Sequence, residues 1–295
     1  MADWSQYPDG TACGEGACSS GACVLDFEWA NWPLPPESPT DYTDNGDGTV
    51  RDNVTGLLWQ KTISSATYLW AAASTYCSAL NLGGELGWRV PSTVELLSIV
   101  DWGKKNPTIN STAFPGTPPN EFWASRPTPS GRPWKVWFEN GTSFPADSTT
   151  YPAHIRCVWT PLPQAQVSSA GAPAGRYTIA TETVKDNETG LTWQRGVAPS
   201  NDWAKSHGYC QALNLGGFNA GWRLPSVTEL ESLIDRRASS GPMVDLAAFP
   251  NTPSVYFWTS VHFAAPSTAV FAVGFGNGMV SWGEEGTSAV FRCVR

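Results

Sequence analysis

Hydrophobic and polar positions occur in the same order twice along this chain of 295 residues. Residues 49–61 read TVRDNVTGLLWQK, and residues 183–195 read TVKDNETGLTWQR. In each segment, alternating residues flank a polar centre, which predicts a β-hairpin whose turn in the first copy lies at residues 53–56. Asp and Asn side chains stabilise tight turns by bonding to the backbone, so the Asp-Asn pairs at 52–53 and 186–187 are interpreted as turn residues.

Two helices are predicted to follow each hairpin. Residues 67–82 of the first copy carry apolar side chains at helical spacing, and Gly83 is the expected C-terminal stop. The apolar positions are Leu69, Ala72, Tyr76, Ala79 and Leu80. A shorter helix is predicted in GWRVPSTVELLSIVD, from Gly87, and in GWRLPSVTELESLID, from Gly221, because STVE and SVTE are both capping boxes.

The residues around these capping boxes complete the expected unit. Val94 and Leu97 should pack the second helix on a sheet. The Arg of each GWR motif is expected to form an ion pair with a nearby carboxylate, namely Arg89 with Glu95 or Asp101, and Arg223 with Glu229 or Asp235. FWAS, WKVWFENGTSF with a turn at residues 140–141, and HIRCVW read as short strands. Two helices followed by antiparallel strands predict an α+β unit.

Further matches show that the repetition covers a whole domain. YCSALNLGG and YCQALNLGG, AFPGTP and AFPNTP, and IRCVW and FRCVR recur at nearly constant spacing, as expected for a tandem duplication. We expect a Cys- and Pro-rich leader at residues 1–38, a first domain at 39–160, a linker at 161–176 and a second domain at 177–295. The leader is too short for a third full domain, and the linker's Pro, Ala, Ser and Gly content predicts that it buries nothing.

Composition favours an exported binding protein over a nucleic-acid or membrane protein. The net charge of −8 offers no basic face for phosphates, and no apolar run approaches the roughly 20 residues of a membrane span. Sixteen Trp together with 28 Gly and 24 Pro are typical of loop-rich extracellular recognition domains. The first ten residues lack the charged and apolar regions of a signal peptide, so a secreted or cell-surface protein would have lost its signal.

Seven cysteines indicate an oxidising compartment. Each unit has one Cys on its predicted first helix and one on its last strand, namely Cys77 with Cys157 and Cys210 with Cys293. This matched placement favours one disulfide in each unit over two buried free thiols. In the leader, Cys13, Cys18 and Cys23 have no fourth ligand nearby for a zinc site. A small disulfide loop is preferred there, with one leftover Cys that could link chains into a covalent oligomer.

The motifs DNGDGTVRDNVTGLLWQ, GWRVPS, FWAS and RCV together resemble the C-terminal domain of the bacterial collagen-like surface adhesin Lcl, and both units share the resemblance. It implies two tandem C-type-lectin-like domains of the formylglycine-generating-enzyme kind, a fold in which a disulfide from helix to last strand is also a hallmark. It further implies exported adhesins, some of which recognise sulfated polysaccharides. The net charge of −8 argues against a sulfated ligand here, since sulfates are bound by Arg and Lys clusters.

A calcium loop is one interpretation of DNGDG at residues 44–48. Its candidate oxygen ligands are Asp44, Asn45, Asp47 and Asp52. An EF-hand loop requires a bidentate Glu at its twelfth position, where this chain has Val54 if Asp47 is the fifth. A polar hairpin turn is therefore the preferred interpretation, with calcium as the alternative and no other cofactor expected.

The loops that differ between the two units are the best candidates for ligand contact. The first unit offers Arg126, Arg132, Trp134 and Glu139, and the second offers His262, Trp282, Glu284 and Glu285. A Trp beside charged groups suits sugar faces and protein hot spots. Strand core is the alternative for the Trp residues of WKVWF. It is the preferred interpretation for Trp137, and for Trp134 both interpretations remain open.

The sequence carries no recognised catalytic motif. The three His are scattered, and HExxH, GxSxG, GxGxxG and P-loop patterns are absent. We therefore expect a non-catalytic, exported protein that binds carbohydrate or an extracellular protein. A structural or assembly component of a cell surface or fibre is the alternative, and a relative of the formylglycine-forming oxidases would need a free reactive Cys.

Overall fold

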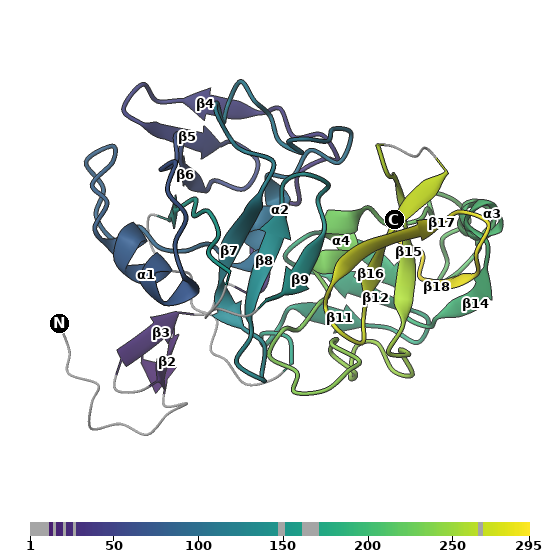
Figure 1. The fold of residues 1–295 in the computed structure, drawn as a ribbon. Coiled ribbons are helices and arrows are strands. Elements are labelled where there is room, and N and C mark those ends of the chain that lie inside the picture. Colours follow the sequence, from purple (N-terminus) through teal and green to yellow (C-terminus); the bar gives the residue numbers. More distant parts are fainter. Residues whose placement is uncertain are drawn as a thin grey trace.

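The computed structural model describes the side chains of residues 28–146, 151–160, 171–264 and 268–295, and the backbone of three short strands in the leader. Within these residues, no helix is both long and apolar enough to cross a membrane. Figure 1 shows two units side by side, the first in blue and teal and the second in green and yellow. Both are built mostly from antiparallel strands, with two short helices each.

The first unit contains two small sheets. The strand order of one is β10-β6-β5-β4, and the other is the meander β7-β8-β9. The bounds of its strands are β4 (Tyr42–Asp44), β5 (Thr49–Asp52), β6 (Leu58–Gln60), β7 (Glu121–Pro127), β8 (Pro133–Trp137), β9 (Ser143–Pro145) and β10 (Val158–Trp159). Its helices are α1 (Trp70–Ser78) and α2 (Thr93–Ser98).

The second unit repeats this arrangement with a wider sheet. Its strands order as β11-β12-β13 and as β14-β18-β15-β16-β17, where only β15 and β18 run parallel. The bounds are β11 (Tyr177–Ile179), β12 (Thr183–Asp186), β13 (Thr192–Gln194), β14 (Ala198–Asn201), β15 (Tyr256–His262), β16 (Ala269–Gly274), β17 (Val280–Glu284) and β18 (Ala289–Phe291). Its helices are α3 (Trp203–Gln211) and α4 (Val227–Glu231).

The repeated TVxDNxTG phrase forms the predicted hairpin in both units. Strands β5 and β6 pair antiparallel, as do β12 and β13. Asp52 Oδ1 accepts the backbone N–H of Val54 at 2.9 Å and that of Thr55 at 3.2 Å. Gly56 completes the turn with a φ of 73°, which favours glycine. Asp186 makes the same pair of bonds in the second unit, so the turn interpretation of both Asp residues is confirmed.

The predicted capping boxes are confirmed, and the preceding Arg binds each of them. Ser92 Oγ accepts the backbone N–H of Glu95, and the Glu95 carboxylate accepts the backbone N–H of Ser92 at 2.7 Å. Arg89 donates to both oxygens of the same carboxylate, at 2.8 and 2.6 Å. Arg223 and Glu229 repeat this contact. Of the carboxylates considered from the sequence, the capping-box Glu is therefore the partner.

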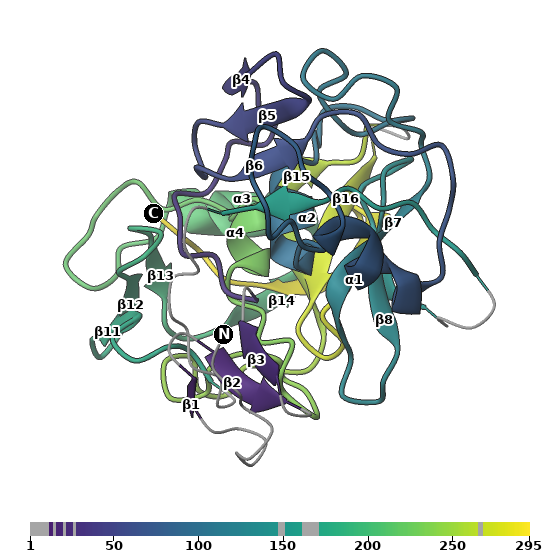
Figure 2. The same cartoon turned by 90° about the vertical axis from the view of Figure 1, so that its left-hand side faces the viewer.

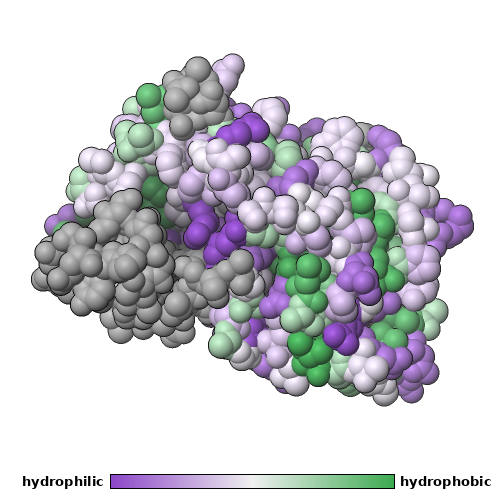
Figure 3. All heavy atoms as spheres, turned by 90° about the horizontal axis from the view of Figure 1, so that it is seen from below, coloured by the Kyte–Doolittle hydropathy of each residue, from purple (hydrophilic) through white to green (hydrophobic). Residues whose placement is uncertain are grey.

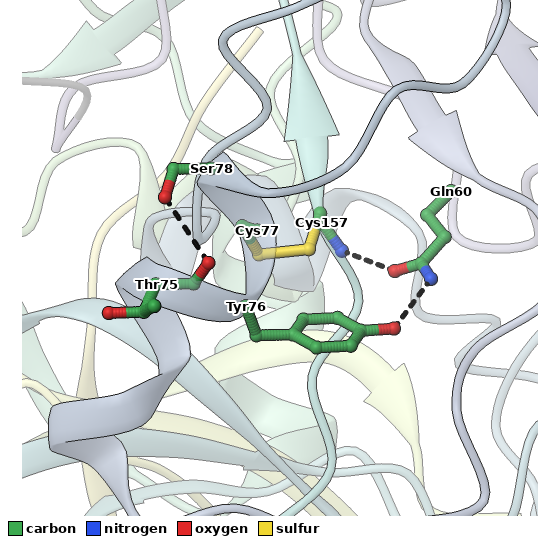
Figure 4. Close-up of a disulfide and its surroundings, with 6 residues drawn as sticks. All are labelled: Gln60, Thr75, Tyr76, Cys77, Ser78 and Cys157. Carbon is green, nitrogen blue, oxygen red and sulfur yellow. Dashed lines mark hydrogen bonds between the residues drawn. A yellow bond between two sulfur atoms is a disulfide. The ribbon is translucent and has the colours of Figure 1, made fainter.

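The two predicted disulfides are confirmed. Cys77 is joined to Cys157, and Cys210 to Cys293. In the first unit, Gln60 lies beside the bond: its Oε1 accepts the backbone N–H of Cys157 at 3.1 Å, and its Nε2 donates to the Tyr76 hydroxyl at 2.9 Å (Figure 4). The Gln of TGLLWQ thus connects the hairpin to the final strand.

The extent and buried face of the first helix were predicted wrongly. Helix α1 covers Trp70–Ser78 rather than residues 67–82, and its C-cap is Ala79 rather than a position near Gly83. Its buried residues are Ala73 and Cys77, while Leu69 is 44% exposed. The disulfide decides this orientation, because Cys77 must face Cys157, which directly precedes strand β10.

The two units share one hydrophobic core. Helix α2 packs on α4 between the units, and Figure 1 places both near the centre of the molecule. The rings of Trp102 and Phe271 meet edge to face across this boundary, with centroids 5.0 Å apart. On its other side, the Arg236 guanidinium lies 4.9 Å from the centroid of the Trp134 ring. The duplicated units therefore form a single packed body.

The leader and linker also pack on this body. Strands β1 (Ala12–Cys13), β2 (Gly16–Ser19) and β3 (Ala22–Leu25) form a small antiparallel sheet at the lower edge of the molecule in Figure 2. After it, Trp29 lies beneath Arg176, and the Ala30 carbonyl accepts from that guanidinium at 2.7 Å. Arg176 also forms a buried ion pair with Asp186, so the expectation that the linker buries nothing is wrong for its last residue.

Candidate ligand-binding site

A cavity of about 220 Å³ opens in the first unit. It lies where the start of β7 meets the end of β8 and the segment that precedes the final strand. That segment is held by two backbone bridges, from Tyr68 to Ala153 and from Phe122 to His154. The lining residues are Thr67, Asn120, Glu121, Trp137, Pro152, Ala153 and His154.

Trp137 supplies the aromatic part of this cavity. It pairs with Glu121 across the β7–β8 ladder, which places both side chains beside the opening. The indole is half-buried, its Nε1 donates to the Pro119 carbonyl at 3.3 Å, and Phe144 contacts the ring edge to face. The expectation that Trp137 is strand core is therefore wrong, because part of its ring remains open to a ligand.

The Glu121 carboxylate is neutralised inside the protein. Lys135 donates to it at 2.6 Å, and the Lys135 side chain is only 1% exposed. The ammonium also lies over the Trp123 ring, 4.4 Å from its centroid, where a cation–π contact adds to the ion pair. One carboxylate oxygen can still accept from a ligand, while the pair carries no net charge.

His154 contributes a neutral polar group. Burial lowers its pKa below the usual value, against a smaller opposing effect of a hydrogen bond that the ring donates to the Ser64 backbone carbonyl. Its Nε2 lies 3.4 Å from the side-chain nitrogen of Asn120. An amide, a carboxylate and an imidazole thus face the same space as an indole. This set can hold hydroxyl groups by donating and accepting hydrogen bonds.

The equivalent positions of the second unit are filled differently. Tyr256 pairs with Gly274 where Glu121 pairs with Trp137. A Cβ on Gly274 would lie 3.0 Å from Tyr256 Cε1, so the phenol ring covers the place of the missing indole. Asn277 fixes this ring by donating to the Tyr256 hydroxyl at 3.1 Å. The counterpart of His154 is Val290, which bridges Phe257 in parallel.

The sequence profile of the Lcl C-terminal domain matches residues 48–159 and again residues 182–295. The chain belongs to the Lcl C-terminal domain family. Each matched segment begins one residue before the repeated hairpin, and the two segments end at Trp159 and Arg295, two residues after Cys157 and Cys293. The resemblance inferred from the motifs is therefore confirmed for both units. No curated protein matches the chain.

The ligand residues predicted for the first Lcl domain lie away from the cavity lining. Arg132 is exposed and donates to the Pro145 carbonyl at 3.0 Å, while Arg126 and Glu139 are half-buried. Trp134 is 1% exposed, because its indole packs in the core between the two units. Of the two interpretations left open for Trp134, strand core is therefore correct. The indole that is only half-buried belongs to Trp137.

The residues predicted for the second Lcl domain lie together at one end of β15 and β17. His262 Nε2 lies 3.4 Å from Glu285 Oε2, and Thr268 donates to Glu284 at 3.1 Å. Trp282 is 44% exposed and contacts Phe263. The sequence reasoning missed Trp203, whose ring meets the His262 ring with centroids 4.4 Å apart. Its position in the first turn of α3 gave no signal of this contact.

The candidate calcium residues are engaged in turns. Asp44 forms an ion pair with Lys61 at 2.5 Å, and Asp47 accepts from the Thr49 hydroxyl at 2.6 Å. Asn45 donates to the same hydroxyl, and Asp52 holds the hairpin turn described above. Among the residues that the structure describes, no group of three or more His, Cys, Asp or Glu side chains is arranged to hold a metal ion. Calcium binding by this loop, the alternative to the preferred turn interpretation, remains untested.

Proposed function

We propose that this protein is an exported, non-catalytic binding protein, built from two C-type-lectin-like units, whose ligand is a carbohydrate. The cavity of the first unit is the observation that carries the proposal. A half-exposed indole beside hydrogen-bonding groups matches the two faces of a sugar ring, because C–H groups pack on aromatic rings while hydroxyls need polar partners.

Export is supported by the two disulfides. Such bonds persist in oxidising compartments and are rare in the cytosol. They also bear on the oxidase alternative, because all four domain cysteines are joined in pairs. The reactive thiol that a formylglycine-type reaction would need is thus not available at these positions.

A broad protein-binding face receives less support than a sugar site. The large exposed apolar side chains of the second unit include Leu246, Val255, Tyr256 and Trp282. Viewed from below, the apolar residues of this unit reach the surface as narrow streaks divided by polar ones (Figure 3). The described part of this one face thus gives no support for a contiguous apolar patch of the kind that marks protein interfaces, and because of the cavity we place an extracellular protein second to a carbohydrate as ligand.

The test is a glycan array followed by calorimetric titration of the best glycan, with and without a chelator. Saturable binding that survives chelation supports a calcium-independent carbohydrate site. Absence of binding to every glycan would overturn the proposal and favour an extracellular protein ligand.

Assembly through the leader is a second candidate function. Strands β2 and β3 place Cys18 directly opposite Cys23 in the backbone register, which leaves Cys13 outside this pair. The side chains of these three residues lie outside the described part of the chain. A covalent dimer on a non-reducing gel, lost on Cys13→Ser, would support assembly, and a monomer would exclude it.

A further inference from the structure

The second unit has positions equivalent to those that line the cavity, but it fills them with residues of different chemistry. Three of its lining residues have register-equivalent partners, since Glu121 corresponds to Tyr256, Trp137 to Gly274 and His154 to Val290. Each exchange removes a group that could hold a sugar: a carboxylate, a half-buried indole and an imidazole. The two copies of this fold have thus diverged where the cavity lies, while the hairpin, capping box and disulfide are kept.

The charge of the cavity selects among carbohydrates. Of the seven described residues that line it, none is Lys or Arg. Its one carboxylate, on Glu121, already binds Lys135 from inside. A sulfate or carboxylate on a sugar would lie against the Glu121 carboxylate, and no cation in the cavity lining would pair with the anionic group. Removing such an unpaired charge from water costs free energy. A hydroxyl would instead donate to Glu121 or accept from Asn120.

The size of the cavity limits how much of a glycan can enter. Its volume of about 220 Å³ is smaller than the roughly 300–1,000 Å³ of pockets for drug-sized molecules. One sugar ring is therefore the unit that the site can surround, with the rest of a chain left in solvent.

From these observations we infer that the first unit alone binds the carbohydrate, and that it takes one uncharged sugar residue of a glycan. The inference rests on the proposed function and makes it specific. Trp137 packs on the apolar face of the ring, while Asn120 and Glu121 bind its hydroxyls and His154 Nε2 lies against the Asn120 amide. The second unit holds the first in shape through the shared core.

The experiment is calorimetric titration of the full chain with two kinds of probe. The neutral probes are the methyl glycosides of galactose, glucose and N-acetylglucosamine, and the anionic probe is a sulfated glycosaminoglycan oligosaccharide. We expect one site per chain for a neutral probe, with an affinity that stays constant between about 50 mM and about 500 mM salt, because screening acts only on charges. Trp137→Ala should weaken this affinity by about ten-fold or more.

Two further variants separate a lost site from a damaged fold. Thr67 is exposed at the cavity lining, so Thr67→Trp should fill the opening and abolish binding without disturbing the core. Tyr256→Ala changes the register-equivalent position of the second unit and should leave affinity unchanged. Near-ultraviolet circular dichroism checks that each variant is folded.

The outcomes distinguish this inference from the proposed function. Binding that weakens steeply with salt, or that prefers the sulfated probe, would overturn the inference and keep a carbohydrate function. Binding that survives Thr67→Trp but is lost on Trp282→Ala would place the site in the second unit. That result would also overturn the inference and keep a carbohydrate function. If neither the array nor these probes show binding, the proposed function itself fails.

Discussion

The backbone N–H of Val280 donates to Ser143 Oγ at 3.0 Å, and these residues occupy equivalent positions in the two units. Ser143 pairs with Val136 on the neighbouring strand, as Val280 pairs with Val273. A contact between equivalent positions is expected on the two-fold axis of an isologous interface, where the same patch of both partners meets. The units thus meet as the subunits of a symmetric dimer would.

The contacts on the two sides of this axis also involve equivalent positions, with the two units exchanged. Trp102 and Arg236 occupy equivalent positions after the second helix, and Trp134 and Phe271 occupy equivalent strand positions. Trp102 contacts Phe271 in one direction, and Arg236 covers Trp134 in the other. One copy of the interface is therefore aromatic, while the other contains a cation whose charge Glu231 balances at 2.5 Å in a fully buried ion pair.

We predict that Arg236→Met destabilises the whole protein by about 3–5 kcal/mol, because it leaves the buried Glu231 carboxylate without its cation. Burial already raises the pKa of Glu231, so the unpaired carboxylate would take up a proton or force the interface apart. Urea unfolding measures the loss. The double change Arg236→Met with Glu231→Leu should regain much of it, whereas an equal loss in both variants would contradict this explanation.

The shared core also predicts that the two units unfold together. Replacing Cys77 and Cys157 by Ala opens a link across a separation of 80 residues, which should cost about 4 kcal/mol in the chain-entropy description. The change lies in the first unit, yet we expect one calorimetric transition at a lower temperature for both. Two separate transitions, with the second at its original temperature, would show that the units are independent.

Sequence patterns predicted those features whose contacts are local. The turn at Asp52 and the capping box at Ser92 involve bonds to residues two or three positions away, so their geometry can be inferred from a short motif. The disulfides were predictable for another reason, because the duplication shows each Cys twice. The tandem repeat, its mostly antiparallel strands with few helices, and the covalent links thus followed from the chain alone.

The buried faces and the cavity depended on partners that are distant in sequence. Helix α1 turns Ala73 inward rather than Leu69, because Cys77 bonds to a residue 80 positions away. Trp134 and Trp137 look alike in the motif WKVWF. The second unit covers Trp134, whereas the segment around His154 leaves part of Trp137 open. Neither partner can be assigned from the pattern of a single strand.

The ion pair between the GWR arginine and the capping-box Glu occurs in both units, as Arg89 with Glu95 and as Arg223 with Glu229, and so offers a matched pair of tests. The Glu95 side chain is 3% exposed and that of Glu229 is 11% exposed, and the Arg partners differ in the same sense. Glu95→Gln should cost about 1–3 kcal/mol, since it removes the charged hydrogen bonds between a buried carboxylate and a guanidinium that is 19% exposed. Glu229→Gln should cost less, because water can solvate Arg223. Chemical denaturation of both variants gives the comparison, and equal losses would refute the role of burial.

The last prediction concerns His154 and acid. Its pKa in the folded protein lies below the usual value of 6.5 because burial disfavours the charged ring. The unfolded chain therefore binds the proton first as the pH falls. The stability contribution is complete above about pH 6.5 and is lost as the pH drops toward the folded pKa, by at most about 1.4 kcal/mol per pH unit.

His154→Gln should remove this part of the pH dependence, so its free energy of unfolding should fall less than that of the parent between about pH 7.5 and about pH 5.5. His207→Gln removes a half-buried imidazole of α3, away from the cavity, and serves as the matched control for a His-to-Gln change. Parallel slopes for the parent and His154→Gln would mean that the folded protein accepts the proton at His154 as readily as the unfolded chain. In that case burial would not be what keeps the His154 imidazole neutral.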